Sequence, residues 1–157
     1  MSRSSSVKQG GPMKSIPKMA SVMTPFPYSI DIEGSVVQAL QIMQEHDVRH
    51  LPVMKDGRPT SIITQSEINF VLAQVKGTPK ADSMKVSEVC ALQAYIVSID
   101  EHLDTVLTTM IENHIGSAIV VKNDRLAGIF TMVDACLCLR DFLRKQAGYD
   151  EPDDTVA

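Results

Sequence analysis

The stretch VRHLPVMKDGRPTSIITQSE, residues 48–67, occurs a second time as IGSAIVVKNDRLAGIFTMVD, residues 115–134. The two stretches lie 67 positions apart and align without a gap, and the alignment extends over residues 18–72. Identical residues and a matched series of apolar positions run through it. Repetition at a fixed spacing indicates one supersecondary unit that is present twice. We therefore predict an α+β fold built from two pseudo-twofold-related repeats.

Each repeat is predicted to begin with a strand and a helix. The segments YSIDI (28–32) and YIVSI (95–99) are rich in β-branched residues, which favour strands. Ser35 can cap the helix that follows, whose apolar residues fall at i, i+3, i+4 and i+7. The corresponding helix of the second repeat begins near Leu103.

A hairpin and a second helix complete each repeat, which gives the order β-α-β-β-α. The hairpin turns contain Asp56-Gly57 and Asn123-Asp124, residue types that tolerate a left-handed backbone. The second helix is expected from Gln65 to about Val75 and from Val133 to about Lys145. Two such units can cover each other's sheets, and a seam between them leaves paired clefts.

The composition excludes several classes of protein. With 157 residues, the chain is long enough for one domain or two small halves. The net charge of −4, without a basic stripe, and the 4% of aromatic residues argue against nucleic-acid binding. No long apolar run indicates a membrane span. Three cysteines without a C-x-x-C motif suggest reduced thiols and a cytoplasmic protein.

The chain divides into five segments by composition and repeat boundaries. The first and last are polar and lack periodicity, so we expect both to be disordered. The segments are a flexible arm (1–14), the first repeat (15–75), a linker (76–82), the second repeat (83–147) and an acidic tail (148–157).

Three motifs carry a resemblance to a known family. VMTP (22–25), VRHLPV (48–53) and GIFTMVD (128–134) resemble the motifs of a tandem pair of cystathionine-β-synthase (CBS) domains, the arrangement called a Bateman module. GIFTMVD fits that family's signature Gly-hydrophobic-hydrophobic-Thr/Ser-x-x-Asp. The resemblance covers roughly residues 16–146 and implies a regulatory module that binds adenosine-type ligands.

The signature can also be interpreted by its chemistry. Thr131 ends a strand beside a helix start, where free backbone N–H groups and the Thr hydroxyl attract a phosphate. Asp134 can accept two hydrogen bonds from a vicinal diol such as that of ribose. Gly128, followed by Ile129, leaves room for a flat base. The alternative is that Thr131 and Asp134 form a capping box and nothing more.

The first repeat departs from this signature, because it contains SIITQSE at residues 61–67. Ser61, followed by Ile62, replaces the glycine and adds a side chain where a base would lie. Thr64 is retained, but Glu67 replaces the aspartate and its extra methylene moves the carboxylate. We expect this site to be weaker, differently selective or empty.

The resemblance implies further contacts. The backbone of the first strand of each repeat should contact the base or sugar, at Tyr95, Ile96 and Val97 in the second repeat and at Tyr28, Ser29 and Ile30 in the first. Arg49 and His50 lie where family members often place basic residues for phosphate. The alternative for this pair is a solvated strand entry.

No reaction of the chain's own is expected. The histidines lack metal-ligand spacing, no nucleophile lies beside a base, and no phosphate-binding glycine loop occurs. We predict a regulatory module that binds AMP, ADP, ATP or S-adenosylmethionine in a cleft between the repeats, with no required cofactor and no metal. By the resemblance, it should form a homodimeric disc and act on a separate effector protein. The alternative is a constitutive dimerisation or scaffold module with vestigial clefts.

Overall fold

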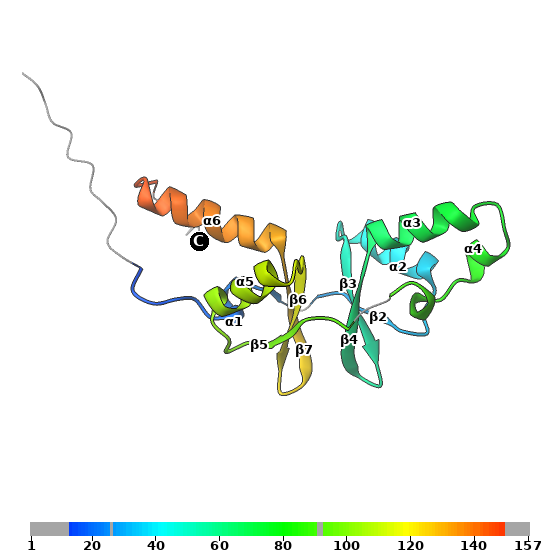
Figure 1. Ribbon diagram of the computed structural model, residues 1–157, viewed down its shortest axis with the longest axis horizontal. Coiled ribbons are helices and arrows are strands. Elements are labelled where there is room, and N and C mark those ends of the chain that lie inside the picture. Colours follow the sequence, from blue (N-terminus) through cyan, green and yellow to red (C-terminus); the bar gives the residue numbers. More distant parts are fainter. Residues whose placement is uncertain (1–12, 26, 91–92, 150–157) are drawn as a thin grey trace, which may run out of the picture.

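A computed structural model describes residues 13–25, 27–90 and 93–149. Most of the predicted arm and tail lies outside the described residues. The described part folds into two adjacent halves, each with helices packed beside a sheet (Figure 1). The elements are α1 (Met19–Val22), β1 (Thr24–Pro25), β2 (Ile30–Asp31), α2 (Val36–Glu45), β3 (His50–Lys55), β4 (Arg58–Thr64), α3 (Gln65–Val75), α4 (Lys80–Ser83), the 3-10 turn η1 (Val86–Glu88), β5 (Ile96–Ser98), α5 (Leu103–Glu112), β6 (Ser117–Lys122), β7 (Arg125–Thr131) and α6 (Met132–Gln146).

The two sheets confirm the α+β fold and the internal repeat. One sheet has the order β2-β3-β4 and the other β1-β7-β6-β5. β2 pairs parallel with β3, as β5 does with β6, and both hairpins are antiparallel. Even the register shift recurs, between Val53 and Met54 and again between Val120 and Val121.

Local sequence signals account for most element boundaries. Ser35 caps α2, since its side chain accepts a hydrogen bond of 3.0 Å from Gln38 N. The hairpin turns have positive φ at Asp56 and Asn123, as the turn residues predict. The first strands are shorter than predicted, because side-chain-capped turns begin early. Asp31 Oδ1 accepts from Glu33 N, and Ser98 Oγ accepts from Asp100 N.

The segment predicted as a linker is not irregular throughout. α4 begins at Lys80, within residues 76–82, and Pro79 precedes it as the N-cap residue. Proline suits a helix start, since its fixed φ is compatible with the first turn. The chain then runs through η1 before it enters β5.

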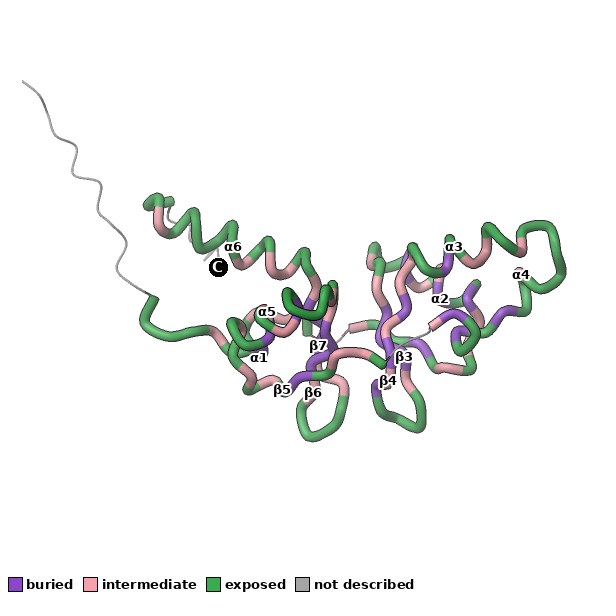
Figure 2. Tube along the Cα trace, in the orientation of Figure 1, coloured by how far each residue is buried: buried purple, intermediate pink, exposed green. Residues whose placement is uncertain are grey.

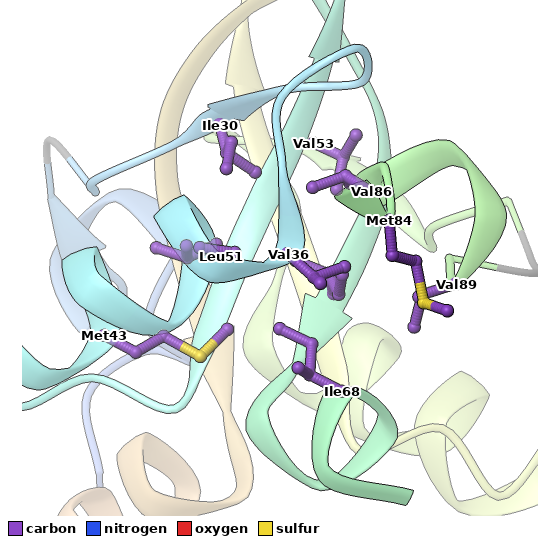
Figure 3. Packing of buried hydrophobic residues seen from close by; sticks show 11 residues of the cluster. Ile30, Val36, Met43, Leu51, Val53, Ile68, Met84, Val86 and Val89 are labelled. Carbon is purple, nitrogen blue, oxygen red and sulfur yellow. The ribbon is translucent and has the colours of Figure 1, made fainter. Parts of the chain in front are cut away.

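Each half is completed by a segment from the beginning of the other repeat. Met19 is fully buried in the core of the second half, and β1 pairs antiparallel with β7. In the same way, the segment at η1 buries Met84, Val86 and Val89 in the core of the first half. Figure 3 shows these three side chains among residues from the first repeat. This exchange of segments was not expected from the sequence.

The two C-terminal helices of the repeats differ in burial. Ile68 of α3 is buried. The structure describes every residue of α6, and none of them is buried. Ala135 occupies the position 67 residues after Ile68, so a large core residue is replaced by a small one. α6 extends away from its sheet and is exposed or half-buried along its length (Figures 1 and 2).

Candidate functional site

Two strand-to-helix junctions lie at the seam between the halves. Thr64 ends β4 at the start of α3, and Thr131 ends β7 at the start of α6. Both helices begin at the same side of the molecule (Figure 1). A helix start presents unpaired backbone N–H groups and the positive end of the helix dipole. The structure therefore brings the two predicted sites onto one side of the seam.

The carboxylate of Asp134 is fixed by three hydrogen bonds. Its Oδ2 accepts from Thr131 N at 2.7 Å and from Thr131 Oγ1 at 3.1 Å. Its Oδ1 accepts from Thr24 Oγ1 in β1 at 2.9 Å. The Thr131 hydroxyl thus donates to Asp134 rather than into the cleft. This arrangement caps α6 and also holds the carboxylate in one orientation.

At the first junction, Glu67 and Thr64 form a complete capping box. Thr64 N and Oγ1 both donate to Glu67 Oε2 at 2.8 Å, and Glu67 N donates to Thr64 Oγ1 at 3.2 Å. The longer side chain of Glu67 reaches its own helix start as well as an aspartate would. The capping box stabilises the start of α3, and Thr131 and Asp134, the pair for which a capping box was the alternative interpretation, form one at the start of α6.

The space beside Gly128 is filled by the chain itself. A Cβ at this position would lie 2.5 Å from Met23 Sδ and 2.8 Å from Thr24 O. The missing side chain thus makes room for the segment at β1, at the place where a base was expected from the sequence. Ile129 is also buried, and it pairs with Thr24.

The equivalent place in the first repeat is filled by a different pair. Ser61 is buried, and its hydroxyl donates to Cys90 Sγ at 3.8 Å. Cys90 lies 67 positions after Met23. The large side chain of Met23 thus packs against Gly128 in the second half, whereas the smaller Cys90 packs against Ser61 in the first half. Ile62, next to Ser61, is half-buried and pairs with Pro52.

Of the predicted phosphate contacts, His50 lies at the seam. It is half-buried and pairs with Thr64 across the hairpin. Burial lowers the pKa of His50, while the charges of Glu67 and Asp134 act in the opposite direction. The pairing places His50 beside the first junction, and the carboxylates of both junctions act on its pKa. Arg49 is exposed, and its carbonyl accepts from Gln65 N at 2.9 Å.

The predicted base and sugar contacts on the first strand of each repeat are backbone groups and exposed side chains at β2 and β5. Ile30 and Val97 point into the two cores, and the carbonyl of Tyr95 accepts from Ile119 N at 2.8 Å. Ser29 and Ile96 are exposed. The rings of Tyr28 and His46 stack with centroids 3.6 Å apart.

Asp134 also lines an open groove of about 710 Å³ beside α6. This volume is in the range of small-molecule sites. Most of the lining is apolar, with Asp134, Asp141 and Lys145 among the charged residues. The lining residues are Met13, Pro17, Ser21, Val22, Leu103, Leu107, Asp134, Ala135, Leu137, Cys138, Leu139, Asp141, Phe142 and Lys145.

The part of the chain that the structure describes contains neither a metal-binding cluster nor a membrane-spanning helix. Across residues 13–25, 27–90 and 93–149, no three His, Cys, Asp or Glu residues gather in a way that could hold a metal ion. Among the helices in the described part of the chain, none combines the length and apolarity needed to cross a membrane.

Sequence reasoning missed Thr24 and Met23 as parts of the site. Both lie in the VMTP region, which carried the resemblance but received no role. Their role depends on contacts with β7, more than a hundred positions away in the chain. A signal for Thr24 was nevertheless present in the sequence. Thr24 has a hydroxyl that can form hydrogen bonds, whereas Ala91, at the equivalent position of the second repeat, has none.

The fold and its paired junctions define a class of protein with two interlocked α+β repeats and a polar seam. The family model described as "CBS domain" matches this chain twice, over residues 19–74 and 86–141. These matches cover more than half of the sequence. The chain belongs to the CBS domain family and contains a pair of such domains.

Solved structures with the same fold include CBS domain pairs with bound ligands. A putative acetoin utilization protein (AcuB) from Vibrio cholerae has a TM-score of 0.72 and 24% identity, covering 88% of this chain and all of that chain. The CBS domain pair of protein MJ0100, in complex with 5′-methylthioadenosine and S-adenosyl-L-methionine, has a TM-score of 0.71 and 24% identity, covering 82% of this chain and 99% of that chain. CBSX2 in complex with AMP has a TM-score of 0.65 and 21% identity, covering 82% and 99% respectively.

A curated relative is named L-aspartate semialdehyde sulfurtransferase, from Methanocaldococcus jannaschii. It is 29% identical over 126 residues, which make up 78% of this chain and 23% of that protein. The chain therefore spans about a quarter of the relative's length.

Proposed function

We propose that this chain is a regulatory module that binds an adenosine-type ligand at the junction of Thr131 and Asp134. The candidates are AMP, ADP, ATP and S-adenosylmethionine. The observation that carries the proposal is the Asp134 carboxylate, which is held in one orientation at a helix start and borders an open groove. A fixed acceptor at the positive end of a helix dipole suits a ligand that carries both hydroxyls and a negative charge.

The relatives support this choice of ligand class. Two CBS proteins with the same fold are described as complexes with S-adenosyl-L-methionine or AMP. His50 lies beside the first junction, and the charge of Asp134 at the second also acts on it, so a protonated His50 would attract a phosphate at the seam. The Thr64 and Glu67 junction would be the weaker or differently selective site, because the extra methylene of Glu67 moves its carboxylate from the position that an aspartate would give it.

The regulatory effect would follow from linkage. A ligand bound at the seam favours the arrangement of halves or protomers for which it has the higher affinity. A separate effector protein would detect that arrangement. The module would catalyse no reaction itself and would need no resident cofactor.

Isothermal titration with a nucleotide panel tests the proposal. Asp134→Ala should weaken binding by ~1.5–3 kcal/mol, about 10- to 150-fold, because it removes a charged acceptor. Asp104→Ala is the matched control, since Asp104 is also a first-turn acid of a helix in the same repeat. The control should leave the affinity unchanged. A chain that binds none of the four ligands, or an Asp134 variant that binds normally, contradicts the proposal.

A second candidate function, a constitutive dimerisation or scaffold module, is favoured by the surface of α6. Met132, Leu139 and Leu143 form a stripe at helical spacing, and each is more than half exposed. Such a stripe is typical of a surface that another chain covers. We propose a homodimer with α6 at its interface. A stable dimer combined with no ligand response would favour the scaffold over the sensor.

A further inference from the structure

The stripe on α6, formed by Met132, Leu139 and Leu143, is specific to the second repeat. Two of its three positions are polar in the first repeat, where Gln65 and Lys76 lie 67 residues earlier. The fold of a repeat therefore does not require this stripe for its own packing. α6 extends away from its sheet, with the three stripe residues more than half exposed (Figure 1).

We propose that a second copy of this chain covers the stripe with its own α6, in antiparallel orientation. Arg144 of the second copy then binds the phosphate of the ligand at the Thr131 junction. This inference rests on the proposed function and on the proposed homodimer, and it adds a phosphate contact that the partner subunit supplies.

The spacing of the apolar residues suits an antiparallel pair. Cys136 is exposed on the same face of α6 and acts as a small apolar residue. In an antiparallel pair, Met132 lies opposite Leu143, and Cys136 lies opposite Leu139. A parallel pair would also match apolar positions, but its two helix dipoles would point in the same direction, which is unfavourable. The antiparallel contact is isologous and closes a dimer.

The same register brings Arg144 to the other copy's junction. Thr131 precedes Met132 and Arg144 follows Leu143, so Thr131 of one copy lies opposite Arg144 of the other. Packed helices lie about 8–10 Å apart, and an extended arginine side chain spans most of that distance. Opposite charges then meet at both ends of the pair, because Asp134 lies at the start of each helix and Arg144 near its end.

The second junction lacks a basic residue at the place where the first junction has one. His50 pairs with Thr64 across the first hairpin, whereas Ser117 pairs with Thr131 across the second. The preceding residue is an arginine in the first repeat and a glycine in the second. A phosphate at Thr131 would therefore gain a cationic contact from the second copy that its own strand entry does not supply.

Arg144 is available for such a contact. It is exposed, and among the described residues it takes part in no ion pair. Arg140, one turn earlier, is already engaged, since it donates to Asp141 at 2.8 and 2.9 Å. A guanidinium binds a phosphate through two parallel hydrogen bonds, which makes arginine well suited to this role.

Calorimetry with AMP and adenosine tests the contact, at protein concentrations where sedimentation shows a dimer. Arg144→Ala should weaken AMP binding about 10-fold, because it removes a charge-assisted hydrogen bond to the phosphate. It should leave adenosine, which has no phosphate, unchanged. Arg140→Ala is the matched control, since it removes the same charge from the same helix, and it should leave both affinities unchanged.

Mixing two variants tests whether Arg144 acts on the other copy. Arg144→Ala and Asp134→Ala chains are combined and allowed to exchange subunits. In a mixed dimer, one junction has an intact Asp134 and receives Arg144 from the other chain. Mixing should therefore restore tight AMP binding that neither variant shows alone. Thermal unfolding checks that the variants fold, and Asp134→Asn replaces Asp134→Ala if the latter does not.

The outcomes separate this inference from the proposed function. The inference is overturned if wild type binds AMP as a monomer, if Arg144→Ala binds AMP as wild type does, or if mixing restores nothing. In each of these cases AMP binding by wild type still supports the proposed function. A wild type that does not bind AMP also overturns the inference, and titration with ADP, ATP and S-adenosylmethionine then decides whether the proposed function falls too.

Discussion

Met23 fills the space that Gly128 leaves open in β7, because a Cβ on Gly128 would lie 2.5 Å from Met23 Sδ. The backbone carbonyl of Thr24 would be only 2.8 Å away, and backbone cannot move aside as a flexible side chain can. The close approach joins the segment at β1 to the second half. Gly128 therefore allows the segment at β1 to pack closely against β7.

Gly128→Ala should destabilise the fold by about 1–3 kcal/mol, the usual cost of overpacking. In a chain of this length, that loss lowers the melting temperature by roughly 2–4 °C per kcal/mol. Gly116→Ala is the matched control, since nothing lies within 4 Å of a Cβ at that position. Equal melting temperatures for the two variants would contradict the packing argument.

The first repeat suggests a compensating pair. There, Ser61 faces Cys90 in place of glycine and methionine. Combining Gly128→Ser with Met23→Cys should therefore cost less than the sum of the single substitutions. Thermal unfolding of the four members of this double-mutant cycle measures the coupling.

Met19→Ala should destabilise the second half, although Met19 belongs to the first repeat in the chain. Met19 is fully buried in the second core, and replacing a buried methionine with alanine costs about 2–5 kcal/mol. Hydrogen exchange should show reduced protection at Ala118 and Val120 and a smaller change at Leu51. Met132→Ala, at a residue 54% exposed, is the control. A loss of protection confined to the first half would contradict the exchange of segments.

Local signals in the sequence were enough to predict the repeat and most of its elements. Ser35, the turn at Asp56-Gly57 and the apolar periodicity of the helices each act within a few residues, so they can be recognised one at a time. The start of α3 at Gln65 was also predicted correctly. The early ends of β2 and β5 depend on small side-chain turns that the strand pattern does not show.

The contacts of the candidate site could not be predicted in the same way. β1 contains only Thr24 and Pro25, which is too short for any periodicity, and its partner β7 lies about a hundred positions away. The neighbours of Gly128 and the third hydrogen bond of Asp134 both depend on that pairing. The ligand roles of Thr131 and Asp134 stay a prediction, to be tested by titration.

Leu143→Glu should convert a dimer to a monomer. Leu143 is 56% exposed on α6, and a charge within an apolar interface must be desolvated without a partner. Sedimentation or light scattering over a concentration series measures the shift. Ser87→Glu adds the same charge at an exposed position in the other half and should have no effect. A wild type that stays monomeric would remove α6 from the proposed interface.

His50 should make stability depend on pH. Burial lowers its pKa in the folded protein, so the folded state binds fewer protons than the unfolded chain near neutrality. The contribution of neutral His50 to the free energy of unfolding is therefore present above about pH 6.5, the ordinary pKa of histidine. It is lost as the pH falls through the lowered pKa of the folded state. His50→Gln removes the titrating group and should flatten this dependence in denaturant unfolding. An equally steep loss of stability in the variant would exclude His50 as its source.

Ligand affinity should depend on pH in the opposite direction. A phosphate beside His50 favours the protonated ring, so a ligand that carries one raises the pKa of His50 and takes up a proton on binding. The affinity for AMP should increase between about pH 8 and about pH 5.5, whereas adenosine, which has no phosphate, should show no such increase. His50→Gln should bind AMP equally at both pH values. If wild type binds AMP and adenosine with the same pH profile, His50 does not contact the phosphate.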